Sequence, residues 1–375
     1  MKFQVDRDAM ADAVNWASRT LPNKSTQPLL TGLHLVAEKS SLVLSGSDAD
    51  VSGQASVNAN VEQPGTVLVP GRLLADITKS LPSTKIEFAL SGNQVNITCG
   101  RSSFTIPTMP VGEYPPLPNM PEFSGSISGN EFAAAISQVA TAASRDETLP
   151  AFTGIKIDVE GSVITLAATD RYRLAVREIN WNPVSTSIAT HTLIPARFLH
   201  EATKSLATSE AISIAFTANN EGLFGIEGSG RKTTSRVLAA DFPPYRTLLP
   251  SESTSVAQVK TSDLIDSVKR VALVLDREAP IKITFKQNEA VIFGGGGSGE
   301  LAAAQETIEA TNNGEEISIA FNHQFLLDGL HAIDAAVAVI AMTTSIRPAV
   351  ITGTNEIGAE SDDSFKYLLM PIRQQ

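Results

Sequence analysis

The chain has 375 residues, of which 42% are hydrophobic and 18% charged, so it can form two or three domains that each bury a core. Its formal net charge of −11 argues against a protein that coats nucleic acid by bulk attraction, but leaves room for a local basic surface. The single cysteine, Cys99, excludes an intrachain disulfide and a metal site built from several cysteines.

Each third of the chain is predicted to begin with a strand followed by an amphipathic helix. Apolar residues recur at helical spacing over residues 8–21, again over residues 130–144, and once more after residue 260. Met10, Phe132 and Leu264 take equivalent places in these three helices. The same unit is therefore expected three times.

A strand hairpin and a second helix follow in each third. The hairpins are predicted over residues 32–48, over residues 154–170 and from residue 281, and Asp48 and Asp170 stand at matching ends. The second helix lies in LVPGRLLADITKSLPS, from residue 68, which is echoed by LIPARFLHEATKSLAT from residue 193 and more faintly by IAFNHQFLLDGLHAI from residue 319. Arg72, Arg197 and Gln324 are equivalent and stand 125 and 127 residues apart, so the repeat is about one domain long.

Further alternating strands complete each third, although residues 335–342, AAVAVIAM, are also compatible with a helix. Proline-rich segments end the first and the second third of the chain, and they predict linkers near residues 121–125 and 250–255. We therefore predict an α+β protein with three repeated domains over residues 1–122, 126–251 and 254–375. Each domain is expected to hold mainly antiparallel sheets backed by two helices.

Several motifs then carry a resemblance that spans the whole chain. They are MKFQVDRD at the start, PLLTGLHL from residue 28, ATDRYRLAV over residues 168–176, FPPYRTLLP over residues 242–250 and YLLMPIR over residues 367–373. In this order and spacing they resemble the bacterial DNA polymerase III beta subunit, the replicative sliding clamp. The resemblance implies a half ring that pairs head to tail with a second copy, so that six domains encircle duplex DNA. It further implies a processivity factor without catalytic activity or a cofactor.

The resemblance also implies residues for DNA contact and for the dimer. A clamp must slide, so a few basic side chains that attract phosphates without reading bases are sufficient. By resemblance, Lys24 and Arg145 in loops are the first candidates for this DNA track. Arg72, Arg197 and Lys204 are added as basic residues of the predicted helices, and a solvated surface charge is the alternative for each of the five. The family's dimer contact corresponds to Phe104 and Ile106 in the first domain and to Val274 and Leu275 in the third; packing in the core is the alternative for these four.

The family's second function is a hydrophobic cleft that captures short peptides of polymerases, the clamp loader and repair proteins. An extended peptide with a Leu/Phe pair needs an apolar pocket with a few polar groups, and Arg173 and Arg373 are expected to hold its polar atoms. The chain departs from the family's usual residues at Arg171-Tyr172 and at Thr247, where the rim of the cleft differs. Ordinary core packing is the alternative for Leu174, Leu248 and Met370. The matching positions are Phe152, Thr169, Arg171, Tyr172, Arg173, Leu174, Pro243, Thr247, Leu248, Ile346, Pro348, Leu368, Leu369, Met370, Pro371, Ile372 and Arg373.

Other signals do not amount to chemistry. The run GGGGSG over residues 294–299 lacks the Lys-Ser/Thr ending of a phosphate loop and is predicted to be a hairpin tip. The five histidines show no metal-ligand spacing, and the acidic pairs at residues 48 and 50 and at 362 and 363 are expected in turns. No metal site is therefore predicted.

Two other classes of protein remain as alternatives. One is a surface protein made of β-repeats, against which stand the two helices per repeat and the absence of a signal peptide. The other is a nucleotidyl-transfer enzyme, which would need paired carboxylates that hold metal ions. No run of about 18 apolar residues is present, so no membrane span is expected. One cysteine and no signal peptide favour the cytoplasm.

Overall fold

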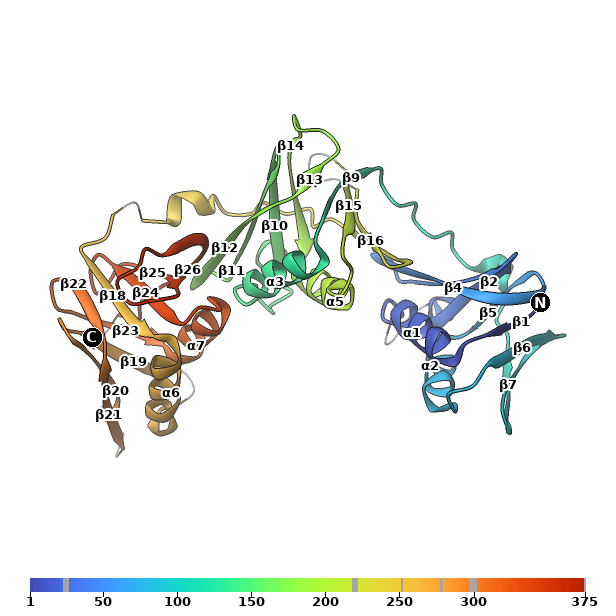
Figure 1. Ribbon diagram of the computed structural model, residues 1–375, viewed down its shortest axis with the longest axis horizontal. Helices are drawn as coiled ribbons and strands as arrows, with labels where there is room; N and C mark the ends of the chain where they lie inside the picture. Colours follow the sequence, from blue (N-terminus) through green and yellow to red (C-terminus); the bar gives the residue numbers. More distant parts are fainter. Residues whose placement is uncertain (23–26, 218–221, 251, 277–278, 297–301, 374–375) are drawn as a thin grey trace. The chain divides into compact units, whose positions relative to one another are not determined.

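The computed structural model describes all residues of the chain except 23–26, 218–221, 251, 277–278, 297–301 and 374–375. The chain divides into two compact units, one formed by residues 1–129 and 208–237, the other by residues 130–207 and 238–375. Figure 1 labels the elements of both units. The predicted central domain thus contributes strands to each unit, so every unit is described below by itself.

The first unit is built on an antiparallel sheet that joins strands of the first and second thirds of the chain. β17 pairs with β4, with Ser235 opposite Val51 and Arg231 opposite Ala55. A three-strand branch consists of β2 (Gly32–Glu38), which pairs with β3 (Ser41–Ser47) and β5 (Gly65–Pro70), while β3 also pairs with β4. The main order is β9 (Phe123–Ile127), β15 (Ile212–Phe216), β16 (Leu223–Gly228), β17 (Arg231–Arg236), β4 (Val51–Gln63), β1 (Lys2–Val5), β6 (Ile86–Ser91), β7 (Gln94–Cys99) and β8 (Ser102–Pro107).

Two helices pack against each other beside this sheet (Figure 1). They are α1 (Arg7–Ser18) and α2 (Gly71–Ser80), and short 3-10 turns η1 (Pro28–Thr31) and η2 (Val111–Glu113) precede β2 and follow β8. Asp6 caps α1 because its carboxylate accepts the amides of residues 8 and 9. Met10 is fully buried on the inner face of α1, as its helical spacing predicts. The helix predicted over residues 8–21 ends earlier, at Ser18.

The second unit holds two antiparallel sheets. In the larger sheet, β12 pairs with β26, with Arg173 opposite Leu369. This sheet therefore joins strands of the second third of the chain to strands of the last third. Its order is β14 (Ala189–Pro195), β10 (Gly154–Glu160), β11 (Val163–Thr169), β12 (Arg173–Asn180), β26 (Asp362–Leu369), β25 (Ala349–Thr354), β24 (Val337–Met342), β18 (Ser255–Lys260) and β22 (Thr311–Gly314). The smaller sheet has the order β21 (Ala303–Glu309), β20 (Glu289–Gly295), β19 (Pro280–Phe285) and β23 (Ile317–Asn322). A two-residue strand, β13 (Asn182–Pro183), follows β12 along the chain.

Four helices of the second unit fall where the repeats predict them, namely α3 (Gly129–Ala140), α5 (Ala196–Leu206), α6 (Thr261–Val271) and α7 (His323–Ala332). The short helix α4 (Pro150–Thr153) was not predicted, and the 3-10 turns are η3 (Tyr245–Leu248) and η4 (Ala272–Val274). Asn322 caps α7 by accepting the amides of Gln324 and Phe325, each at 3.0 Å. None of the described helices combines the length and the apolar character that crossing a membrane would need.

Two uncertain segments are settled by their neighbours. Residues 337–342, for which a helix was also possible, form β24 between β18 and β25, where both edges of the strand are hydrogen-bonded. In the glycine run, Gly295 pairs with Ala303, so the described part of residues 294–299 belongs to the β20–β21 hairpin as predicted, while residues 297–299 lie outside the described residues.

Candidate functional site

The turn between β11 and β12 carries several of the residues predicted to bind a peptide. One carboxylate oxygen of Asp170 accepts the amides of Tyr172 at 3.0 Å and Arg173 at 3.1 Å. The hydroxyl of Thr169 accepts the amide of Arg171 at 3.3 Å and donates to the carbonyl of Arg173 at 2.7 Å. Arg171 itself has φ of 79°, in the left-handed region that non-glycine residues seldom occupy. The side chains of Asp170 and Thr169 thus fix the turn that presents Arg171 and Tyr172.

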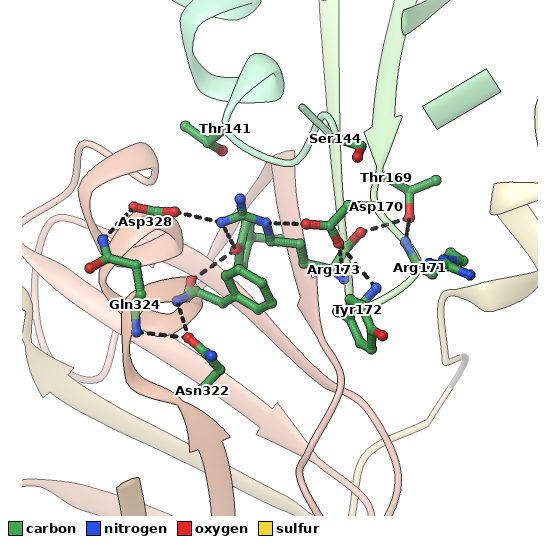
Figure 2. A network of polar contacts seen from close by, with 12 residues as sticks. Thr141, Ser144, Thr169, Asp170, Arg171, Tyr172, Arg173, Asn322, Gln324 and Asp328 are labelled. Carbon is green, nitrogen blue, oxygen red and sulfur yellow. Dashed lines mark hydrogen bonds and ion pairs between the residues drawn. The ribbon is translucent and has the colours of Figure 1, made fainter. Parts of the chain in front are cut away.

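Arg173 is the centre of a buried polar network (Figure 2). Its Nε donates to Asp170 at 2.9 Å, and its Nη1 donates to Asp328 on α7 at 2.6 Å and to the hydroxyl of Tyr367 on β26 at 3.4 Å. The Tyr367 hydroxyl in turn donates to the carbonyl of Phe325 at 2.8 Å. Only 9% of Arg173 is exposed, so these partners satisfy a charge that would otherwise be costly to bury.

The electrostatics of this network keep its charges fixed. Burial alone would lower the pKa of Arg173, but Tyr367, Asp328 and Asp170 outweigh it and raise that pKa. Burial raises the pKa of Tyr367 as well, so its phenol stays protonated and can donate to the Phe325 carbonyl. Arg173 therefore stays charged and Tyr367 neutral at physiological pH.

The structure gives Arg173 partners within the chain, while its expected contact with a peptide stays a prediction. Its Nε and Nη1 are engaged by groups of the chain itself, because the side chain points into the junction of β12, β26 and α7 rather than towards solvent. Arg373, the other arginine expected in that role, is exposed.

Aromatic and cationic side chains stack above this network. The Arg173 guanidinium lies 4.3 Å from the ring centre of Phe325, and the rings of Phe325 and Tyr172 are stacked at 6.3 Å. The guanidinium of Arg171 lies 5.8 Å from the ring of Phe152 and 5.9 Å from that of Tyr172. Phe152 on α4, the 170–172 turn and α7 are thereby connected in one continuous surface.

The apolar residues predicted for the cleft divide into a floor and a rim. Leu174 and Leu368 are buried with Ala167, Val176 and Tyr245, so ordinary core packing holds for them, and Leu369 is also fully buried. Four large apolar side chains instead face solvent: Tyr172 is 56% exposed, Leu248 48%, Ile346 60% and Met370 41%. Exposed apolar side chains above a buried core are typical of a binding surface.

The remaining predicted cleft residues flank these two groups. Met370 is held where its amide donates to the carbonyl of Tyr172 at 2.8 Å, and Ile372 where its amide donates to the carbonyl of Ala320 at 2.8 Å. Pro243, Pro348 and Pro371 are half-buried, and Thr247 is exposed in η3 with its hydroxyl donating to the carbonyl of Pro244 at 2.8 Å.

The residues predicted to contact DNA lie on the surface where the structure describes them. Arg72 lies in the first turn of α2, Arg145 in the loop between α3 and α4, and Arg197 and Lys204 belong to α5; all four are exposed. Arg197 pairs with Glu201 at 3.0 Å on the same helix face. Lys24 lies outside the described residues.

The predicted dimer residues differ in exposure. Phe104 on β8 is 36% exposed, whereas Ile106 on the same strand is buried at 2%. Val274 and Leu275 are half-buried at the end of η4, next to Leu273, which is 84% exposed and was not predicted. Within a single chain, the side chain of Ile106 therefore packs in the core.

Three residues of the network were missed from the sequence, namely Phe325, Asp328 and the hydroxyl of Tyr367. Phe325 and Asp328 stand at i and i+3 on α7 and hence on one helical face, which is the only local signal that they share a site. Of the two acidic pairs expected in turns, Asp48 and Asp50 lie in one, where Asp48 accepts two amides of its own turn. For the other pair the expectation is wrong, because Asp362 and Asp363 begin β26, where Asp362 accepts the amide of Ser364. Among the described residues, no group of three or more His, Cys, Asp or Glu could hold a metal ion.

Comparison with known proteins identifies the class to which this fold and site belong. Family models for the DNA polymerase III beta subunit match in sequence order: the N-terminal domain over residues 1–118, the central domain over residues 126–244 and the C-terminal domain over residues 246–373. The chain is 47% identical to the beta sliding clamp of Streptomyces coelicolor, over all of this chain and 99% of that one. It therefore belongs to the DNA polymerase III beta subunit family.

Solved structures agree with this assignment. The DNA polymerase sliding clamp of Bacillus subtilis superposes with a TM-score of 0.91 at 26% identity, and both chains are covered completely. The clamp of Pseudomonas aeruginosa, at 23% identity, matches in fold with a TM-score of 0.92 over both full chains. The predicted three-domain α+β clamp fold is thus confirmed, and the chain is a sliding clamp, a processivity subunit rather than the catalytic subunit of the polymerase.

Proposed function

We propose that this chain pairs head to tail with a second copy, encircles duplex DNA without regard to sequence, and tethers its partners through a peptide-binding cleft. We place it in the cytoplasm, with domains at residues 1–122, 126–251 and 254–375. The partners are the replicative polymerase, the clamp loader and repair proteins. The surface formed by Tyr172, Leu248, Ile346 and Met370 over the Arg173 network is named the partner cleft.

The observation that carries the proposal is that four exposed apolar side chains belong to segments that also supply one buried cluster. Tyr172, Leu248, Ile346 and Met370 each stand within four residues of Leu174, Leu249, Val350 or Leu368, which belong to this cluster or pack against it. As a floor, this cluster accepts the apolar side chains of an extended peptide, while Arg171 and Arg373 supply exposed cations for its polar or acidic groups. Met370 adds a side chain that adapts to different partners.

Two sheet edges support the proposed dimer. β8 is the last strand on its path in the first unit, and β21 is the outer strand of the four-stranded sheet in the second. Phe104 adds exposed apolar surface on β8 itself, and Leu273 adds it on η4, which contacts β20, the strand paired with β21. Open strand edges and exposed apolar groups both favour association with another copy, which can bury them.

The proposed contact with DNA relies on charge without base recognition. Arg72, Arg145, Arg197 and Lys204 present exposed cations, whereas the chain as a whole is strongly acidic. A few phosphate contacts of this kind give weak, salt-dependent attraction that permits sliding. Retention on DNA then comes from enclosure.

The experiment that tests the proposal compares circular and linear DNA. The protein, loaded by its clamp loader on nicked circular DNA, is expected to co-elute with the circle in gel filtration and to dissociate after the circle is linearised. The free protein is expected to elute as a dimer. A monomer that binds both forms of DNA equally would contradict the proposal.

A further inference from the structure

The hairpin that presents the partner cleft is repeated in the first third of the chain. β2, β3 and the start of β4 correspond to β10, β11 and the start of β12, with equivalent residues 122 positions apart throughout. The carboxylate of Asp48 accepts the amides of Asp50 at 2.8 Å and Val51 at 2.7 Å, as Asp170 accepts those of its own turn. Asp48 and its turn thus repeat the side chain–amide hydrogen bonds of the cleft's turn, although Ala49 lacks the positive φ of its equivalent Arg171.

The repeat extends to the neighbouring strand. The amide of Arg236, at the end of β17, donates to the carbonyl of Asp50 at 2.8 Å. The amide of Met370, which follows β26, donates to the carbonyl of Tyr172 over the same 2.8 Å. Because Asp50 is the equivalent of Tyr172, Arg236 occupies the place that Met370 has in the partner cleft.

A pocket of about 670 Å³ opens at this repeated corner, entirely within the first unit. Leu30 lies where the partner cleft has Phe152, and Pro115 and Pro116 come from the segment equivalent to Pro243 and Pro244. We name it the repeat pocket and define it by Leu30, Asp50, Val51, Pro115, Leu223 and Arg236.

The chemistry of the repeat pocket differs from that of the partner cleft. Val51 stands where the cleft has Arg173, so the apolar side chains of Leu30, Val51 and Leu223 line the interior without a buried ion network. Asp50 and Arg236 replace the exposed Tyr172 and Met370 at the rim. Their charged groups lie 3.6 Å apart with 71% and 66% of the side chains exposed, so their mutual attraction is weak and a ligand can replace it.

We propose that the repeat pocket is a second docking site, which binds a short extended peptide that combines a branched apolar side chain with a basic one. The apolar side chain enters between Leu30, Val51 and Leu223. The basic group pairs with Asp50, because Asp48 and Asp50 give the pocket two carboxylates against the one guanidinium of Arg236. The net charge of −11 on the chain disfavours an acidic ligand further. The choice of a peptide rests on the function proposed for the partner cleft.

The test uses the full-length protein and an array of short synthetic peptides built from leucine, valine, serine, lysine and glutamate, measured by fluorescence polarisation. Peptides with leucine or valine next to lysine are expected to bind the unmodified protein better than their glutamate counterparts. Leu223→Arg is expected to weaken the binding of these peptides about tenfold or more. Asp50→Ala is expected to weaken their binding severalfold, and Leu248→Arg in the partner cleft is expected to leave it unchanged.

Asp50→Ala keeps the test decisive even if Leu223→Arg, in a half-buried strand position, fails to fold, because Asp50 is exposed. Peptides that lose binding in Leu248→Arg but not in Asp50→Ala would belong to the partner cleft and would overturn the proposal. The proposal would also be overturned if no peptide of the array bound saturably at concentrations up to about 1 mM. A dissociation constant of that size corresponds to a binding free energy of about 4 kcal/mol. Binding of polymerase-derived peptides, which tests the partner cleft separately, distinguishes a failure here from a failure of the proposed function.

Discussion

Nη1 of Arg173 donates to the carboxylate of Asp328 over 2.6 Å, and this contact joins β12 to α7 across 155 residues of sequence. The same guanidinium lies against the ring of Phe325, one helical turn before Asp328. Arg173 therefore fixes α7 relative to the turn that carries Tyr172. We infer that it positions the wall of the partner cleft without touching the peptide.

Replacing Arg173 by Ala is expected to destabilise the fold and to weaken peptide binding together. Removal of the arginine leaves Asp170 and Asp328 without their cation, which should lower the free energy of unfolding by roughly 3 kcal/mol. This is the low end of the range for breaking a buried ion pair, because a third of the Asp328 side chain is exposed. Chemical denaturation and peptide titration measure the two effects. Arg177→Ala, four residues along β12, is the matched control and should lower stability less, without affecting the peptide. Unchanged peptide affinity in Arg173→Ala would show that the network has no part in forming the cleft.

Deleting residues 370–375 is expected to abolish binding of polymerase-derived peptides while the dimer persists. The deletion removes the exposed side chain of Met370 and the bonds from its amide to Tyr172 and from the amide of Ile372 to Ala320. Peptide titration and gel filtration report the two properties. If the dimer is lost and the peptide still binds, the cleft has been placed on the wrong surface.

Leu273→Asp is expected to weaken the proposed dimer by roughly tenfold or more, because it puts a charge into apolar surface that association would bury. Leu273 is 84% exposed, so the monomer itself should remain folded. Analytical ultracentrifugation over a dilution series measures the dissociation. The control is Leu73→Asp, which changes another exposed leucine, 43% accessible on α2. Equal dissociation constants for the two variants would argue against a contact at η4.

The combined replacement of Arg72, Arg145 and Arg197 by Ala is expected to reduce the dependence of DNA affinity on salt. Each lost phosphate contact should lower the slope of log K against log salt concentration by about one, without changing sequence preference. Affinities measured on several duplexes over a range of salt supply the slope. Lys85→Ala, an exposed lysine outside the set, is the control. A slope equal to that of the control would remove these arginines from the DNA track.

Stability is expected to fall in mild acid because of His34. Burial lowers the pKa of His34, whose ring stacks on Tyr114 at 5.7 Å, below its usual value near 6.5. The unfolded chain then takes up the proton more readily than the folded one, so the free energy of unfolding decreases as the pH falls below about 6.5 and levels off below the folded pKa. Urea denaturation of His34→Gln beside the unmodified protein isolates this contribution, and identical pH profiles would exclude it.

The sequence predicts the parts of this fold that depend on local pattern. The repeated helices, the hairpins and the matching positions of Asp48 and Asp170 follow from periodicity and from comparison of the thirds. β24 could not be distinguished from a helix, because a strand buried between two others loses the alternation of apolar and polar residues.

The contacts of the site were harder to predict because they join distant segments. Nothing near Arg173 in sequence indicates that Asp328 and Tyr367 complete its network. The sheets present the same difficulty: the pairing of β17 with β4 and of β12 with β26 joins strands across the predicted domain boundaries. No turn or linker signal marks such pairings.

The division of the central domain between two compact units has a consequence for cleavage. The chain passes from one unit to the other between residues 129 and 130, again between 207 and 208, and a third time between 237 and 238. A protease that cuts one of these passages leaves the units covalently joined through the others. In a fragment limited to the central third, β17 would lack its pairing with β4 and β12 its pairing with β26. The unpaired strand edges would favour aggregation.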